Sequence, residues 1–325
     1  MPRLILTNGD TAADLLVAAG RAGRIQPWRD VLHEGPIAFD LAAAMKLRVP
    51  WLARRMRIDA TEVAAAFADR DALVQAHDRF DEIELWFEHD LYDQLQLLQI
   101  LAFFADAGRS EGLTLIQADD FLGAQTPDTI LSFATAARPV DGHDLDLAER
   151  VWADLAMPTP ERAFAFLASE ADPRLPYVEP ALRRFFEELP APGTGLSRTE
   201  FAALTAIASG ATDPFRLFGA VTMTEPAAFM GDASFFAMLD DLAVSAVPLV
   251  AGIAPPGAPE DEMRRHEAAS LTLTEAGRAV LAGGADHIAL NGIDRWWAGT
   301  HQAGRAVWRY DRHAVELVPP PSPGA

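Results

Sequence analysis

The stretch that most constrains the fold is residues 83–100, where a strand pattern passes through a charged turn into an apolar helix pattern. Residues 83–87 (Ile-Glu-Leu-Trp-Phe) alternate and favour a strand. Leucines then recur at helical spacing from residue 91 to residue 101, and Gly108 is a suitable helix stop. Together they predict half of a βαβ unit. In open α/β sheets such a turn lies at the carboxyl edge of the strands, where ligands bind.

The first 120 residues repeat this alternation. Further strands are predicted at residues 4–6, 25–28 and 113–116, and helices at residues 11–19, 40–48 and 59–80. We therefore expect an α/β N-terminal domain over residues 1–125, small and three-layered, with a mostly parallel sheet. Asp10 or Thr11 is expected to cap the first helix. Asp90 is expected to cap the helix after residue 90, with Asp93 answering it as an acidic variant of the capping box.

The rest of the chain is predicted to be mainly helical. Prolines divide residues 126–195 into short helices of a connecting region, and residues 191–195 are a linker candidate. Residues 196–317 are expected to form a C-terminal α+β region. Its three helices, at residues 197–208, 213–221 and 233–243, precede strands at 249–253 and 270–273, which is similar to a winged-helix arrangement. Residues 318–325 are proline-rich and expected to be disordered.

Charge and composition exclude several classes of function. The formal net charge is −20, from 47 acidic and 27 basic residues, which argues against a general nucleic-acid surface. The chain has no cysteine and therefore no disulfide, thiol nucleophile or cysteine-bound metal. It shows no signal-peptide pattern and no apolar run near the roughly 20 residues that span a bilayer. A cytoplasmic protein that does not bind membranes is expected, and the oligomeric state stays open.

Three polar turns follow strands of the predicted sheet, at residues 8–10, 30–34 and 88–90. Turns that leave the same ends of neighbouring parallel strands converge, so we expect these side chains to form one site. The candidate catalytic residues are His33, Glu88, His89 and Asp90. The candidate ligand-binding residues are Asn8, Gly9, Asp10, Asp30 and Glu34, with Arg48 from the basic stretch of residues 46–57.

Two chemistries suit such a set of side chains. Carboxylates bind a hard divalent cation, and the two histidines add a possible zinc site, although no His-Glu-x-x-His spacing is present. Alternatively, a histidine and repelling carboxylates supply a general acid and base. Asn8-Gly9 before a helix suits an anion, so a small anionic ligand is the expected partner. The competing interpretation is structural, with Asp10 and Asp90 as caps and the histidines as hydrogen-bonded scaffold.

A second dense constellation lies near the C-terminus. Residues 284–301 mix Asp, His, Asn, Arg and Trp with glycines. Either these side chains contribute to a site, or Asp294 and Arg295 find partners in a buried polar turn whose tryptophans fill the core.

The motifs of the first domain resemble an uncharacterised bacterial family, the domain-of-unknown-function family numbered 1835. The matching pieces are Thr7-Asn8-Gly9-Asp10, residues 27–36 and residues 85–94, and residues 271–301 look like the C-terminal part of its longer members. The resemblance supports the domain and the choice of motifs, and it brings no established reaction, cofactor or catalytic residue.

The sequence thus favours an α/β protein that binds a small, anionic ligand or substrate, with catalysis by a hydrolase or phosphoryl-transfer mechanism left open. The alternative is a ligand-sensing or protein-interaction module without catalysis. Residues 232–243 contain three aspartates and no basic residue, which argues against DNA as the partner of a winged-helix module.

Overall fold

The computed structural model describes residues 2–168, 171–257 and 262–321. The chain forms two compact units. The first unit comprises Met1–Trp51, Asp59–Leu182 and Ala298–Thr300, and the second comprises Leu52–Ile58, Arg183–Trp297 and His301–Ala325.

The first unit is built around a five-stranded sheet of order β2-β1-β3-β4-β5, in which the first four strands are parallel and β5 is antiparallel. The mostly parallel α/β domain predicted from the sequence is therefore confirmed. The elements from the N-terminus to α7 are β1 (Arg3–Thr7), α1 (Asp10–Ala18), β2 (Arg24–Pro27), α2 (Leu41–Met56), α3 (Ala60–Gln75), η1 (His77–Arg79), β3 (Glu82–Phe87), α4 (Leu91–Asp106), β4 (Leu113–Gln117), η2 (Leu122–Ala124), η3 (Ile130–Ala136), β5 (Arg138–Pro139), α5 (Gly142–Leu155), α6 (Glu161–Phe166) and α7 (Val178–Phe186).

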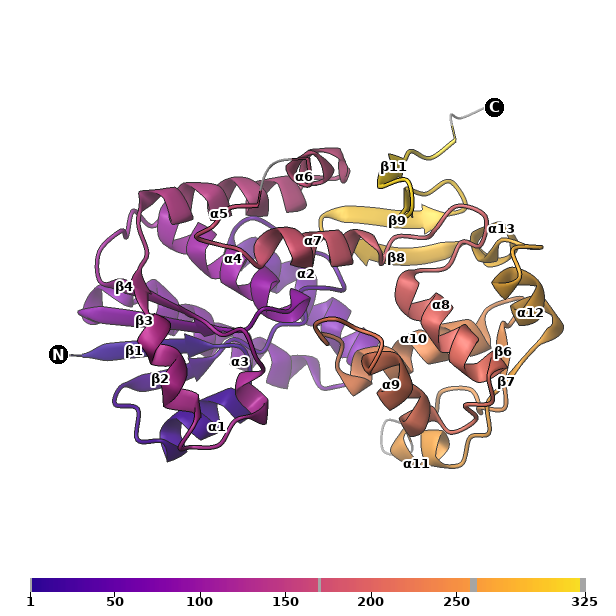
Figure 1. Cartoon of the computed structure of the whole chain (residues 1–325), viewed down its shortest axis with the longest axis horizontal. Helices are drawn as coiled ribbons and strands as arrows, with labels where there is room; N and C mark the ends of the chain where they lie inside the picture. Colours follow the sequence, from indigo (N-terminus) through magenta and orange to yellow (C-terminus); the bar gives the residue numbers. More distant parts are fainter. Residues whose placement is uncertain (1, 169–170, 258–261, 322–325) are drawn as a thin grey trace. The chain divides into compact units, whose positions relative to one another are not determined.

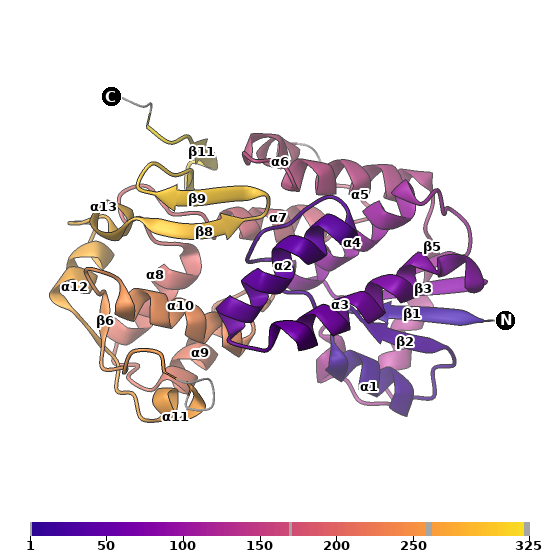
Figure 2. The ribbon, with the colours of Figure 1, turned by 180° about the vertical axis from the view of Figure 1, so that it is seen from behind.

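Helices cover both faces of this sheet. Figure 1 shows α4 on one side and α1 on the other, and the reverse view in Figure 2 shows the same arrangement. On the α1 face, a buried cluster joins Ile5, Trp86 and Ile116 of three adjacent strands to Leu16 of α1 and Leu122 of η2. Because strand side chains alternate between faces, Leu85 and Phe87 point the other way, and both are fully buried. The sheet is thus buried on both sides, as expected of a parallel sheet.

Two local features of this unit differ from the sequence prediction. The region after β4 contains η2, η3 and strand β5, which was not predicted because it has only two residues and therefore leaves no alternating pattern. The helix expected to end at residue 48 continues through Pro50 to Met56. A proline disfavours a helix interior, but the buried side chains of Arg48 and Leu52 hold the residues on both sides of it.

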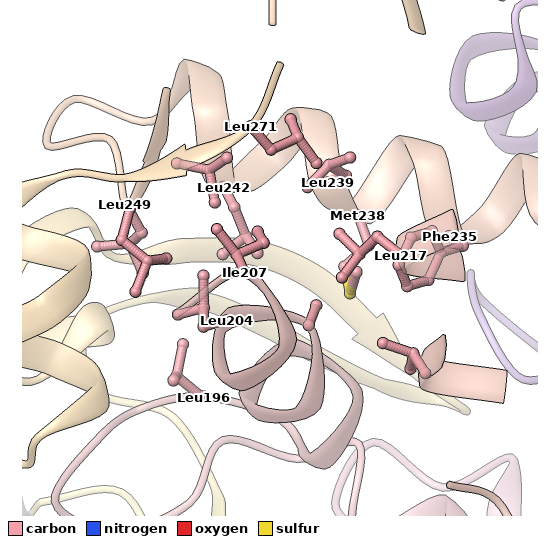
Figure 3. Packing of buried hydrophobic residues seen from close by; sticks show 14 of the residues in the cluster. Leu196, Leu204, Ile207, Leu217, Phe235, Met238, Leu239, Leu242, Leu249 and Leu271 are labelled. Carbon is pink, nitrogen blue, oxygen red and sulfur yellow. The ribbon is translucent and has the colours of Figure 1, made fainter. Parts of the chain in front are cut away.

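The second unit has its own core. Three helices precede a two-stranded antiparallel pair, β6–β7. Figure 3 shows Leu204, Leu217, Leu239 and Leu242 of the three helices packed with Phe235, together with Leu249 and Leu271, which precede the two strands. Ser197 caps α8 (Arg198–Ala208) in a capping box with Glu200. The elements are α8 (Arg198–Ala208), α9 (Pro214–Thr222), α10 (Asp232–Val244), β6 (Val250–Ala251), α11 (Glu262–Glu267), β7 (Thr272–Leu273), α12 (Glu275–Leu281), α13 (His287–Asn291), β8 (Ile293–Trp297), β9 (Thr300–Gly304), β10 (Arg309–Asp311) and β11 (Glu316–Val318).

The predicted disordered tail begins where the last strand ends. Val318 pairs with Arg309 in the β10–β11 ladder, so this residue is ordered. Residues 322–325 lie outside the described residues, and the prediction for them stays a prediction.

Candidate functional site

The candidate site lies at the carboxyl ends of β1 and β3. The strand order places the topological switch point between these two neighbours, because the chain proceeds from β1 outward to β2 and returns to the other side of β1 for β3. Their register pairs Thr7 with Trp86, so the residues that follow them leave the sheet at the same edge. Asn8 follows β1, and Glu88 follows β3.

Asn8 connects the two turns. Its Nδ2 donates to Glu88 Oε1 at 3.1 Å and to Asp93 Oδ2 at 2.9 Å. Its Oδ1 accepts from the backbone N–H of Gly9 at 2.6 Å. One amide therefore uses both donor hydrogens on carboxylates of the β3–α4 turn, and this fixes the end of β1 against the start of α4.

Three carboxylates gather at this turn, and we call them the carboxylate triad: Glu88, Asp90 and Asp93. One oxygen of each lies within 4.8 Å of the other two, and all three residues are buried. Glu88 Oε1 also accepts from the backbone N–H of Leu122 at 2.7 Å, which joins the loop after β4 to the triad. The grouping follows from local geometry, because the strand end, the helix cap and the first helical turn bring residues 88, 90 and 93 together.

The predicted reciprocal capping box at α4 is only half formed. Asp90 is the N-cap, and its Oδ1 accepts from the backbone N–H of Asp93 at 3.1 Å, as expected. Asp93 does not return the bond to Asp90. Its Oδ1 instead accepts from the backbone N–H of Glu88 at 2.7 Å, and its other oxygen faces Asn8. The Asn8 contact draws the Asp93 carboxylate toward the strand ends.

Burial dominates the electrostatics of the triad. It raises the pKa of Asp90 to about 8, with the negative charge of Glu88 as the second cause. Burial likewise raises the pKa of Glu88, against the lowering effect of its hydrogen bonds from Leu122 and Asn8. The pKa of Asp93 is raised well above its ordinary value by burial and by the charges of Asp90 and Glu88. The triad therefore favours a bound proton or cation at neutral pH.

Two side chains near the triad in sequence each have one buried polar atom without a hydrogen-bond partner among the described residues. Gln94 Nε2 donates to the backbone carbonyl of Glu88 at 2.5 Å, while its Oε1 is buried and has no partner. His89 Nδ1 is also buried without a partner. Burial lowers the pKa of His89, against the opposing charges of Asp120 and Asp119.

Two aromatic rings lie near the ring of His89. The His89 ring centroid lies 5.1 Å from that of Phe121 and 6.0 Å from that of Tyr177. All three residues are partly exposed. Phe121 immediately precedes Leu122, whose backbone N–H donates to Glu88 Oε1.

The turn after β2 is held by a buried ion pair. Arg48 and Asp30 are both fully buried, with Arg48 Nη2 2.6 Å from Asp30 Oδ1. Arg48 also donates to the backbone carbonyls of Val31, Glu34 and Pro36, at 2.9, 3.1 and 3.0 Å. The guanidinium predicted to bind an anion is thus enclosed by the loop that it organises.

The remaining predicted residues lie apart from the triad's hydrogen bonds. His33 is buried with its ring 6.2 Å from that of Tyr92 on α4, and Glu34 is partly exposed. Asp10 is exposed and pairs with Arg29 at 2.5 Å. Asp10 and Thr11 do not cap α1, because the N-cap is Gly9, which has no side chain to cap with.

The structure therefore joins the first and third turns through Asn8, which bonds Glu88 and Asp93. Gly9 and Asp90 bond only within their own turns, and Asp10, Asp30 and Arg48 have ion-pair partners of their own. Sequence reasoning had treated Asp93 only as a capping residue, and had not singled out Gln94, Phe121 or Tyr177. The spacing of acids at residues 88, 90 and 93 is the one signal that pointed to Asp93.

The second constellation, at residues 284–301, is stabilised by partners within the second unit. Arg295 pairs with the buried Glu200, and Trp297 donates to the backbone carbonyl of Phe185 at 2.8 Å while its ring stacks on Phe185 at 4.5 Å. Asp294 accepts from His301 at 2.7 Å when the histidine is protonated at Nε2. The contacts of Arg295 and Trp297 match the structural alternative, whereas the Asp294–His301 pair is exposed and does not form part of a buried turn.

Comparison of the chain with protein-family models and with curated proteins gave no match to either. Among the described residues, no helix combines the length and apolar character needed to cross a bilayer.

Proposed function

We propose that the first unit binds a small anionic ligand or substrate through a divalent cation held by the carboxylate triad, Glu88, Asp90 and Asp93. The observation that carries this proposal is the approach of three buried carboxylates to within 4.8 Å. Within the described residues, their hydrogen-bond donors are backbone N–H groups and the Asn8 amide, and no Lys or Arg pairs with them. An added cation supplies the missing positive charge.

The donor set defines the class of cation. Carboxylate oxygens suit the hard cations Mg²⁺, Mn²⁺ and Ca²⁺. A cation held by only a few protein oxygens keeps coordination positions for a ligand. Phosphate or carboxylate oxygens fill such positions, which is how an acidic site binds an anion.

This arrangement supports hydrolysis or phosphoryl transfer. A bound divalent cation polarises a phosphoryl or carbonyl oxygen and lowers the pKa of a bound water. The chain's own part is to fix the cation: Asn8 orients Glu88 and Asp93, and Leu122 N–H holds Glu88. The resemblance of the motifs to the uncharacterised bacterial family remains a prediction that adds no reaction.

A second candidate chemistry needs no metal. Burial raises the pKa of Asp90 to about 8, so this carboxyl group holds a proton at neutral pH and is placed beside Glu88 as a general acid. The two candidates differ in their response to cations, and the experiment below separates them.

The second unit supports the alternative of a sensing module. Its order of three helices followed by the β6–β7 pair is similar to a winged helix, and α10 takes the place of a recognition helix. That helix carries three aspartates and no Lys or Arg. We therefore propose a protein as the partner of any winged-helix-like module here, in place of DNA.

Thermal unfolding with and without cations tests the cation site. Millimolar Mg²⁺, Mn²⁺ or Ca²⁺ should raise the melting temperature, because binding at 100 times Kd adds about 2.7 kcal/mol to the free energy of unfolding. Asp90→Asn should abolish the shift, whereas Asp10→Asn, a control at an exposed acid, should retain it. An unchanged melting curve with every cation would reject the cation site and leave the metal-free acid as the remaining candidate.

A further inference from the structure

A buried histidine in the second unit is linked to the loop that leads into β6. His287 of α13 is 3% exposed, and its Nδ1 lies 3.2 Å from Nδ2 of Asn291, one helical turn further along. Asn291 in turn contacts Val247, in the loop of residues 245–249 that connects α10 to β6. Val247 and Asn291 are 44 residues apart in sequence, so this contact joins two separate segments of the chain.

Two hydrogen bonds hold Val247 to Asn291, and we call them the amide clamp. Asn291 Oδ1 accepts from the backbone N–H of Val247 at 2.7 Å, and Asn291 Nδ2 donates to the backbone carbonyl of Val247 at 3.0 Å. The oxygen of a side-chain amide only accepts and its nitrogen only donates, so both bonds form in one orientation of the amide. The clamp therefore determines which atom of Asn291 faces His287.

The amide clamp also determines the protonation of His287. Nδ2 of Asn291 faces the imidazole and is a donor, so Nδ1 of His287 must accept and cannot carry a hydrogen. The imidazole is then neutral, with its hydrogen on Nε2. A proton on Nδ1 would set two donors against each other, and turning the amide of Asn291 would set its NH2 group against the Val247 N–H. A closed clamp and a protonated His287 are thus incompatible.

Ionisable side chains from several segments act on His287, and each of them has an ion-pair partner. They are Glu200 on α8 with Arg295 on β8, Asp286 before α13 with Arg309 on β10, and Asp241 on α10 with Arg55. Burial lowers the pKa of His287, and the charge of Glu200 is the largest opposing effect. Because each of these acids already has a cation beside it, burial prevails and favours the neutral imidazole that the clamp requires.

We propose that His287, Asn291 and Val247 form a pH-sensitive switch, in which protonation of His287 opens the amide clamp and releases the loop of residues 245–249. The pKa of His287 is lower in the folded protein than its ordinary value of 6.5, so the stability that the neutral imidazole provides is present above about pH 6.5 and is lost as the pH falls below it. The switch is independent of the carboxylate triad, which lies in the first unit.

Two measurements on the unaltered chain test the switch. Nitrogen NMR shifts of the imidazole should show the Nε2–H tautomer of His287 at pH 7.5. Amide hydrogen exchange, corrected for its intrinsic pH dependence, should show the protection of the Val247 N–H falling about tenfold between pH 7.5 and pH 5, which corresponds to the loss of a hydrogen bond worth about 1.4 kcal/mol. The Gly277 N–H, which donates to Thr274 Oγ1, should keep its protection as the internal control.

Variants separate the switch from a histidine with a purely structural role. His287→Gln keeps a neutral acceptor that does not titrate, so Val247 should stay protected at both pH values. Asn291→Ala removes the clamp and should leave Val247 weakly protected at both. His313→Gln, at an exposed histidine of the same unit, should behave as the unaltered chain.

Three results on the unaltered chain would each overturn the switch, even where a variant does not fold. They are an Nδ1–H tautomer of His287 at pH 7.5, a His287 that is still neutral at pH 5, and equal protection of Val247 at the two pH values.

Discussion

Asn8 Nδ2 lies 3.1 Å from Glu88 Oε1, and this hydrogen bond joins the ends of two adjacent parallel strands from turns that are 80 residues apart in sequence. The same nitrogen donates to Asp93, so a single neutral amide is shared between two buried carboxylates. Its replacement should reveal how much the assembled turn contributes to the fold.

Asn8→Ala should lower the free energy of unfolding by about 1–3 kcal/mol, because it leaves Glu88 and Asp93 with one donor fewer in a buried position. Urea unfolding at pH 7 measures the change. The matched control is Asp10→Ala, two residues away, which removes an exposed ion pair and should cost less than about 1 kcal/mol. Equal losses for the two variants would contradict a special role for Asn8.

Stability of the cation-free protein should fall as pH rises from about 4 to about 8. The folded-state pKa of Asp90, about 8, exceeds its unfolded value, so in this interval the folded protein keeps a proton that the unfolded chain releases. One such group changes the free energy of unfolding by up to about 1.4 kcal/mol per pH unit, and Glu88 and Asp93 shift in the same direction.

Melting temperatures from pH 4 to pH 9 measure this dependence. Asp90→Asn preserves an N-cap side chain and should flatten the curve, because asparagine does not titrate. A saturating divalent cation should flatten it as well. A stability that rises steadily from pH 4 to pH 8 would refute the protonated triad.

Arg48→Met should destabilise the first unit by about 3–5 kcal/mol, because it leaves Asp30 buried without its main partner and frees three loop carbonyls. The double variant Arg48→Met/Asp30→Asn should recover part of that loss in a denaturant titration. Arg54→Met, at an exposed position on the same helix, should change stability by no more than about 0.5 kcal/mol. If the two single variants behave alike, the buried pair is not what holds residues 30–36.

Ser197→Ala should cost the second unit about 1 kcal/mol through loss of the capping box at α8. Ser197→Asp keeps a capping oxygen and should restore most of the stability. Hydrogen exchange at the first turn of α8 reports the change locally, and unaltered protection there in the alanine variant would show that the cap is dispensable.

The strongest local patterns predicted the correct elements. Residues 82–87 and 91–106 formed the expected strand and helix, because alternation and leucine spacing are local properties that the buried sheet then reinforces. The capping residues Asp90 and Ser197 were also predictable, since each satisfies backbone N–H groups a few residues away. Strand β5 was not, because two residues that include a proline carry no periodicity.

The site was predictable in place and only partly in membership. Asn8, Glu88 and Asp90 follow strands whose parallel pairing can be expected from the alternation of elements. Asp10 pairs with Arg29 and Arg48 pairs with Asp30, so both ion pairs depend on the course of the chain after β2. Arg29 adopts a left-handed conformation with φ of 57°, which no sequence pattern predicts. Phe121 and Tyr177 come from irregular segments, so only three-dimensional packing brings them to His89.

The neighbouring positions of β1 and β3 have a kinetic consequence. The chain between these strands contains α1, β2, α2, α3 and η1. Pairing of β1 with β3 therefore closes a long loop, and the chain loses conformational entropy before the strand hydrogen bonds stabilise the pair. Helix α4 and its cap can form from local interactions alone, but Asn8 reaches the acids only after that closure. A nascent polypeptide released before β3 has joined β1 can group Glu88, Asp90 and Asp93 locally, but it lacks the Asn8 hydrogen bonds that join these acids to the end of β1.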